Sequence, residues 1–326
     1  MRAAFLIIGL LGAGCRSRAD HPPETSTGLP APAFDAALVN DAVPIASAST
    51  PSPPPPTVDF VATAPKGGRS LGHTSVVFKI ELANGAKSVF KPSTRRGPRR
   101  YKGEIAAYRL GVALGLGANV PKAYFRTFEA QALANVLAAP ALELHEKESI
   151  IEGSRVKGAI MPWIDDLDFV ALEKEPLLSE WKRWLEKGAA IPEEKKRMAG
   201  EIAAMICFDW LTANWDRWSG GNVGISKNGG QLLFVDNDGA FFEVPPKDGL
   251  ERTKKLLLAM DRFPKALLEK IRALDEAKLA EIVGEESKFV PLLSAKAFAG
   301  VIERKKELVE IVDKKHHDGG ETSFFP

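Results

Sequence analysis

The chain has 326 residues, of which 45% are hydrophobic and 26% are charged. These proportions are ordinary for a globular protein, and the length allows one large folded region with appended segments. The formal net charge is only +2, so the composition gives no sign of a nucleic-acid partner. The two cysteines, Cys15 and Cys207, are too few for a scaffold held together by several disulfides.

The amino terminus has the pattern of an export signal. Residues 1–15 contain one arginine, an apolar run over residues 3–11, small residues and then Cys15. The run is too short to cross a bilayer and is typical of the core of a signal peptide. The small residues before Cys15 resemble a bacterial lipoprotein cleavage site, although the usual leucine lies one place early, at Leu11. We therefore expect residues 1–14 to be a signal peptide and Cys15 to carry a lipid at the bacterial cell envelope.

Residues 15–58 are expected to be a tether. They are rich in proline, alanine, serine and threonine, and they end in a proline run over residues 51–56. Such a segment has too few apolar side chains to offset the entropy cost of ordering. A tether behind a lipid-modified cysteine would hold a domain off a membrane surface. A proline-rich ligand for a partner domain is the alternative.

Strand patterns begin at about residue 59. Residues 74–82 and 86–91 are apolar segments of strand type, joined by Asn84-Gly85, a strong hairpin signal. The glycine-bearing stretch 66–74 precedes them and is expected to be a loop. Backbone N–H groups of such a loop can approach phosphates closely, but a flexible connection is the equal alternative.

Lys91 and Glu104 form the first candidate pair. Lys91 ends an apolar strand, and Ile105, Tyr108 and Val112 have helical spacing that predicts an inward helix face with Glu104 at its edge. A strand lysine paired with a helix glutamate can hold the phosphates of a nucleotide. Taken singly, an exposed lysine and a glutamate favoured at a helix start are the better explanations of the two residues, and they become functional candidates only together with the loop downstream.

The segments that follow are less specific. The basic run 95–102 could face phosphate, but a solvated loop is the more common explanation. Residues 122–128 and 156–163 have strand character, and residues 130–140 have helical character. The 156–163 strand would either lead into a hinge between two lobes of the fold or be an ordinary core strand followed by a turn.

A second candidate site follows a helix expected over residues 192–211. Residues 223–226 and 231–235 are short apolar segments separated by a turn signal at 227–230, which predicts a β-hairpin. The hairpin would bring Asn222 and Asp236, which are fourteen positions apart, together at its open end.

Asp216 lies six residues before Asn222, so three oxygen-bearing side chains should converge at this end of the hairpin. Carboxylate and amide oxygens suit Mg²⁺ or Mn²⁺ held together with nucleotide phosphates. An aspartate beside such an ion can accept the proton of an attacking hydroxyl. Arg217 and Asp209 are expected to brace the loop, and Asp238 is a second-rank candidate.

The remaining chain is expected to be helical over residues 250–260, 265–274, 276–283 and 295–312. His316-His317 could bind metal but is more simply a solvated tail. The five histidines have no spacing that predicts a zinc site or a Ser/His/Asp triad.

Three motifs resemble those of an atypical kinase superfamily. Asp216-Arg217 with Asn222 resembles the D-R-x-x-x-N element, and residues 235–237 resemble the I-D-N element. Residues 91–110 resemble the pattern K-P…G-E-x-x-A-Y. The superfamily includes phosphatidylinositol 3-/4-kinases, HipA-type and CotH-type kinases, and the secretory-pathway kinases related to four-jointed, whose pattern is the most similar.

The resemblance implies a two-lobed α+β kinase-like fold over residues 59–326, with a β-rich upper lobe over about 59–163 and a helical lower lobe over about 164–326. It also implies ATP with Mg²⁺ or Mn²⁺ and transfer of the γ-phosphate to a hydroxyl of a protein, a glycan or a small molecule. Asp216 would deprotonate that hydroxyl, and Asn222 and Asp236 would hold the metal. Lys91, oriented by Glu104, would bind the phosphates.

Two departures leave alternatives open. The usual spacing from the loop aspartate to the asparagine is five, whereas Asp216 and Asn222 are six apart, and Trp218 stands where histidine is frequent. A bacterial envelope is also poor in ATP. A catalytically silent kinase-fold protein that binds a ligand or partner is therefore the alternative. A nucleotidyl transferase using the same pocket is the third interpretation.

Overall fold

The computed structural model describes residues 58–72, 76–227 and 230–325. These residues belong to one compact unit that extends from Pro56 to Pro326. The expected signal peptide, Cys15 and most of the expected tether lie outside the described residues. None of the helices in the described ranges is long and apolar enough to span a membrane.

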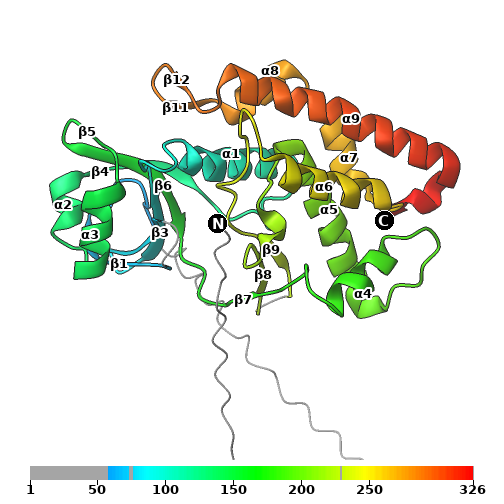
Figure 1. Ribbon diagram of the computed structural model, residues 1–326, viewed down its shortest axis with the longest axis horizontal. Coiled ribbons are helices and arrows are strands. Elements are labelled where there is room, and N and C mark those ends of the chain that lie inside the picture. Colours follow the sequence, from blue (N-terminus) through cyan, green and yellow to red (C-terminus); the bar gives the residue numbers. More distant parts are fainter. Residues whose placement is uncertain (1–57, 73–75, 228–229, 326) are drawn as a thin grey trace, which may run out of the picture. The chain divides into compact units, whose positions relative to one another are not determined.

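A six-stranded antiparallel sheet forms the β-rich lobe (Figure 1). Its strands pair in the order β1-β2-β3-β6-β4, and β5 pairs with β6. The β2–β3 hairpin turns at Asn84-Gly85, where Gly85 has a φ of +81°, a conformation that glycine adopts without strain. The bounds are β1 Pro65–Ser70, β2 Phe78–Leu82, β3 Lys87–Pro92, β4 Tyr124–Glu129, β5 Ile151–Glu152 and β6 Arg155–Pro162.

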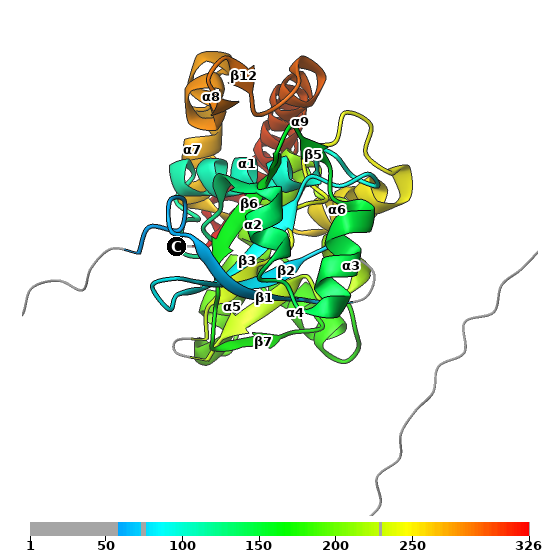
Figure 2. The ribbon, with the colours of Figure 1, turned by 90° about the vertical axis from the view of Figure 1, so that its left-hand side faces the viewer.

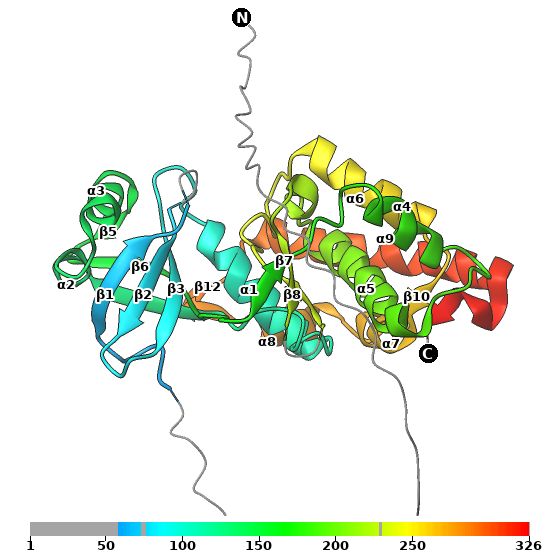
Figure 3. The ribbon, with the colours of Figure 1, turned by 90° about the horizontal axis from the view of Figure 1, so that it is seen from below.

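Side chains alternate between the two faces of a strand, so the two faces of this sheet pack against different helices. Phe78, Phe90 and Ile160 pair across β2, β3 and β6 and share one buried cluster with α2 (Ala130–Ala134) and α3 (Ala139–Glu148). Ala159 and Met161 on the opposite face join the cluster that contains α1 (Arg100–Ala113). Figure 3 shows α2 and α3 on one side of the sheet and α1 on the other.

The second lobe is mainly helical and surrounds α5, whose residues from Ile202 to Thr212 are all buried. Helices α4, α6 and α9 pack against α5, whereas α7 packs against α9 and α8 packs against α1 (Figures 1 and 2). The helix bounds are α4 Leu177–Trp184, α5 Lys196–Thr212, α6 Lys247–Ala259, α7 Lys265–Arg272, α8 Glu276–Val283 and α9 Ala295–Gly319, and the 3₁₀ turns are η1 Glu193–Lys195, η2 Arg217–Ser219 and η3 Gly320–Ser323.

Short strands complete the helical lobe. One three-stranded sheet has the order β7-β8-β9, and two further pairs are β10 with β13 and β11 with β12. The β8–β9 pair is the hairpin predicted from the sequence, whereas β7, which pairs with β8, was not predicted. The bounds are β7 Leu167–Phe169, β8 Val223–Ser226, β9 Leu232–Phe234, β10 Phe263–Pro264, β11 Glu285–Ser287, β12 Val290–Pro291 and β13 Phe324–Phe325.

Two local expectations were wrong. The predicted glycine loop is largely strand β1, and a Cβ on Gly68 would lie 2.7 Å from the Leu137 side chain. The connection between α2 and α3 lies directly against this strand, where the Gly68 N–H donates to the Val136 carbonyl and the Ala138 N–H donates to the Gly68 carbonyl. Val112 is 50% exposed, because the buried face of α1 runs through Ile105, Leu110 and Gly111 and leaves Val112 outside it.

Candidate active site

The hairpin β8–β9 sets the positions of Asn222 and Asp236. Val223 pairs with Phe234, so Asn222 before β8 and Val235 after β9 flank the open end. Asp236 has a φ of +56°, a left-handed conformation that aspartate tolerates better than most residues. Such an outlier is typical of a functional position held by its surroundings.

Arg217 is the brace of this loop. Its side chain is fully buried, and its Nε donates to both carboxylate oxygens of Asp209, at 3.2 and 3.1 Å. Its other nitrogens donate to the carbonyls of Asn222 and Val235 and, at 2.6 Å, to Asn237 Oδ1. One guanidinium therefore ties α5, the loop and both ends of the hairpin together, as expected for Arg217 and Asp209.

The six-residue spacing leaves Asn222 in contact with Asp216. Asn222 Nδ2 donates to the Asp216 carbonyl at 2.8 Å and to Ser219 Oγ at 3.2 Å. Gly220 and Gly221 have φ values of +102° and +75°. Only glycine adopts the first of these readily, so the path of the loop between Asp216 and Asn222 depends on Gly220.

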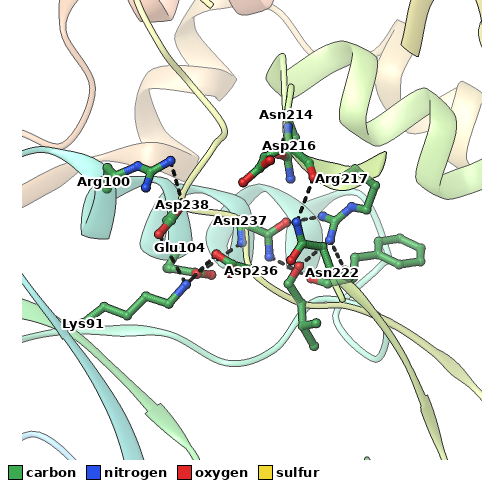
Figure 4. Close-up of polar contacts among 12 residues, drawn as sticks. Lys91, Arg100, Glu104, Asn214, Asp216, Arg217, Asn222, Asp236, Asn237 and Asp238 are labelled. Atoms are coloured by element: carbon green, nitrogen blue, oxygen red, sulfur yellow. Dashed lines mark hydrogen bonds and ion pairs between the residues drawn. The ribbon is translucent and has the colours of Figure 1, made fainter. Parts of the chain in front are cut away.

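Lys91 lies at the centre of a cluster of carboxylates (Figure 4). Its Nζ lies 2.5 Å from Glu104 Oε1, 2.6 Å from Asp236 Oδ1 and 3.6 Å from Asp238 Oδ2, and its side chain is 11% exposed. The structure thus brings together Lys91 from β3, Glu104 from α1 and Asp236 from the end of the hairpin.

The electrostatics of the cluster follow from burial and pairing. Burial by itself would lower the Lys91 pKa, but Glu104 and the two aspartates outweigh it and raise that pKa above its usual value. Burial opposes ionisation of Asp236, yet the Lys91 charge holds the pKa of Asp236 below its usual range. The ammonium and the Asp236 carboxylate therefore stay charged at neutral pH.

Close packing of α1 fixes Glu104. A Cβ on Gly103 would lie 2.5 Å from the Asn237 carbonyl oxygen and 3.2 Å from that of Ala240, so the helix lies directly against the segment after Asp236. The Asn237 N–H donates to Glu104 Oε1 at 3.1 Å. Glu104 therefore holds the Lys91 ammonium and the backbone after Asp236 at once.

Two further residues of the cluster were not ranked as site residues from the sequence. Asp238 is buried, and Arg100 Nη2 lies 3.6 Å from its Oδ1. Asp238 was only a second-rank candidate, because a residue two positions after Asp236 shares its face in an extended chain. Arg100 belongs to a basic run whose composition does not distinguish it from its neighbours.

The donor set fits a divalent metal held jointly with phosphates. Among the described residues, no group of three or more histidine, cysteine or acidic side chains is arranged to hold a metal. Asn222 uses Nδ2 for two hydrogen bonds, so its Oδ1 is the acceptor that remains for a metal. One carboxylate and one amide match the few protein ligands that Mg²⁺ uses when phosphates supply the others.

The chain has a β-rich lobe, in which a strand lysine pairs with a helix glutamate, and a helical lobe that carries the loop and the β8–β9 hairpin. This combination defines the protein-kinase-like fold. No family model and no curated protein matches the sequence. Among solved structures, the chain is similar to the Golgi casein kinase, with a TM-score of 0.62 and 14% identity over 80% of this chain and 74% of that one.

Two further structures have the same fold. Hydra Fam20 with sugar has a TM-score of 0.61 and 16% identity over 81% of this chain and 89% of that one. The Golgi casein kinase with Mn/ADP bound has a TM-score of 0.62 and 14% identity over 81% and 76%. The likeness confirms the expected two-lobed α+β kinase-like fold and its resemblance to secretory-pathway kinases.

Proposed function

We propose that the protein is a metal-dependent phosphotransferase that moves the γ-phosphate of ATP to a hydroxyl of a protein, a glycan or a small molecule. One observation carries the proposal. Lys91 contacts Glu104 and Asp236 at once, at the hairpin end that also holds Asn222 and Asp216. Kinases use this set of groups to bind phosphates and metal and to position an acceptor.

Each residue has a role in the proposed reaction. Lys91, held by Glu104, would bind phosphate oxygens, and Asn222 and Asp236 would hold Mg²⁺ or Mn²⁺, which neutralises charge on the phosphates. The acceptor oxygen would form a bond to the γ-phosphorus while the bond to the bridging oxygen breaks and ADP leaves. Asp216 would position the acceptor and take its hydroxyl proton.

Both sequence departures have structural explanations that do not disturb these groups. Trp218 is buried and stacks on Trp181, with ring centroids 5.6 Å apart, so it is a core residue of the loop. Gly220 and Gly221, between Asp216 and Asn222, both have positive φ, which lets the chain turn within the longer spacing. These observations support an enzyme over a catalytically silent protein that only binds a ligand or partner.

Radiolabel transfer tests the proposal. The full chain carrying Cys15→Ser is incubated with Mn²⁺ or Mg²⁺ and γ-labelled ATP, with casein as a general protein acceptor, and label on either protein is measured. Asp216→Asn and Asp236→Asn should each reduce transfer at least a hundredfold. Asp168→Asn, which removes an exposed aspartate paired with Lys227 at 3.3 Å, is the matched control.

The alternatives give different results. Binding of Mn²⁺–ADP, measured by thermal shift, without label transfer to the chain or to casein would favour the silent protein. Label from α-labelled ATP but none from γ-labelled ATP would indicate nucleotidyl transfer. Transfer that survives both aspartate substitutions would refute the assigned roles.

We also propose that Cys15 anchors the protein by a lipid at the bacterial cell envelope. The support is the apolar run over residues 3–11 followed by small residues and Cys15. Mass spectrometry of the chain expressed in bacteria should find a diacylglyceryl group on Cys15, and Cys15→Ser should release the chain from membranes. An unmodified Cys15 in a processed chain would contradict the proposal.

A further inference from the structure

A cavity of about 710 Å³ lies beside the reaction centre. Three distant segments line it: residues 96–103 at the start of α1, residues 240–244 after Asp238, and residues 291–297 at the start of α9. The volume lies within the range of small-molecule sites. Arg100, one of the lining residues, reaches Asp238 on its other side, so the cavity adjoins the Lys91 cluster.

The interior of the cavity is apolar. Phe241, Phe242, Leu292 and Leu293 line it, and Val244 is 71% exposed although it is hydrophobic. Phe241 has a φ of +60°, which is a strained conformation for a bulky side chain. The chain thus holds an aromatic residue in an unfavourable backbone state at the wall of a cavity that an apolar ligand would fill.

One side of the cavity is cationic. Four basic residues and one acidic residue line it. Among the residues that the structure describes, each of the four basic side chains pairs with one carboxylate. A guanidinium has five N–H donors, and the Arg99 side chain is 70% exposed with one partner, so donors remain for a ligand. The basic residues are Arg96, Arg99, Arg100 and Lys102, and their partners are Glu148, Glu243, Asp238 and Glu286.

The chain itself places a carboxylate at this side. Glu243 Oε1 lies 2.6 Å from Arg99 Nη1, and a hydrogen bond from Ser294, together with Arg99, lowers the Glu243 pKa. Ser294 is the residue that caps α9, where the helix dipole favours negative charge. The geometry between Arg99 and Ser294 therefore suits a carboxylate.

We propose that this cavity binds an amphipathic carboxylate, with its aliphatic chain among the phenylalanines and leucines and its head group at Arg99. A fatty acid has the two properties that the lining requires, an apolar body and a single anionic end. Binding of a fatty acid at this cavity does not require phosphate transfer, so the two can be tested separately.

Calorimetric titration with dodecanoate, kept below its micelle concentration, tests the proposal on the full chain carrying Cys15→Ser. Saturable binding at one site is expected. Acetate supplies the head group alone and dodecyl maltoside the chain alone, and each should bind at least tenfold more weakly. Equal binding of dodecyl maltoside, or no saturable binding of dodecanoate, would overturn the proposal.

Charge variants locate the head group. Arg99→Glu should weaken dodecanoate binding about tenfold or more, whereas Glu243→Gln should strengthen it by removing the internal competitor. Arg155→Glu is the matched control, because Arg155 has similar exposure and a glutamate partner at 2.7 Å but does not line the cavity. Circular dichroism verifies that each variant is folded. Binding that responds equally to Arg99→Glu and Arg155→Glu would also overturn the proposal.

Discussion

Lys91 Nζ lies 2.5 Å from Glu104 Oε1 and 2.6 Å from Asp236 Oδ1, so one buried ammonium compensates two carboxylates. Removing it would leave both charges without their partner. Lys91→Met should therefore lower the free energy of unfolding by about 3 kcal/mol, measured by urea denaturation. Lys66→Met removes an exposed pair with Glu81 and should change stability by about 0.5 kcal/mol at most. Equal effects of the two substitutions would contradict this account.

The buried ion pair between Arg217 and Asp209 should be energetically coupled. Arg217→Met leaves the buried Asp209 carboxylate unpaired and should destabilise the chain by about 3–5 kcal/mol. The double variant with Asp209→Leu should be less destabilised than the sum of the two single variants, because it removes both charges. A double-mutant cycle by chemical denaturation measures this, and strictly additive effects would show that the pair is not coupled.

Two helical glycines should respond to alanine with opposite signs. The Gly103 Cβ position is 2.5 Å from the Asn237 carbonyl oxygen, whereas a Cβ on Gly200 in α5 meets nothing within 4 Å. Gly103→Ala should push α1 from the segment after Asp236, destabilising the chain by about 1–3 kcal/mol. Gly200→Ala should stabilise it by about 0.5–1 kcal/mol. Thermal unfolding of both variants measures the two changes in stability. A change of the same sign in Gly103→Ala and Gly200→Ala would contradict the prediction.

His145 should make stability depend on pH. It is buried, with Nδ1 2.9 Å from Ser149 Oγ, and burial lowers its pKa below the usual 6.5. Below pH 6.5 the unfolded chain therefore binds more protons than the folded one, so this contribution to stability is lost as pH falls toward the folded pKa.

Replacement of His145 tests this effect. His145→Gln should flatten the dependence of the unfolding free energy on pH below about 6.5, measured by urea denaturation at a series of pH values. His317→Gln removes an exposed histidine and serves as the control. A slope that is the same in all three proteins would contradict the prediction.

Local sequence signals predicted the elements that turns and periodicity define. Asn84-Gly85 marked the β2–β3 hairpin, and the pattern around residues 223–235 marked the β8–β9 hairpin and with it the convergence of Asn222 and Asp236. The glycines at 67 and 68 gave the wrong prediction of a loop. The reason lies in Leu137, whose packing against Gly68 joins residues far apart in sequence.

The rest of the site depends on tertiary contacts that no local pattern contains. Arg100 sits among similar basic residues, and only its approach to Asp238 distinguishes it. The cavity beside it is lined by segments about 200 residues apart in sequence, so it exists only because the fold brings the starts of α1 and α9 to the same place. Helical spacing placed Val112 on the inward face of α1, but the surfaces that pack against the helix bury Leu110 and Gly111 instead.

The contact between Lys91 and Asp236 joins residues 145 positions apart. Contacts of such long sequence separation are slow to form, and domains emerge from the ribosome amino terminus first. A nascent chain that ends before the β8–β9 hairpin therefore contains Glu104 but lacks Asp236, the second carboxylate that contacts the ammonium. The buried cluster around Lys91 can be completed only after residue 236 has been synthesised.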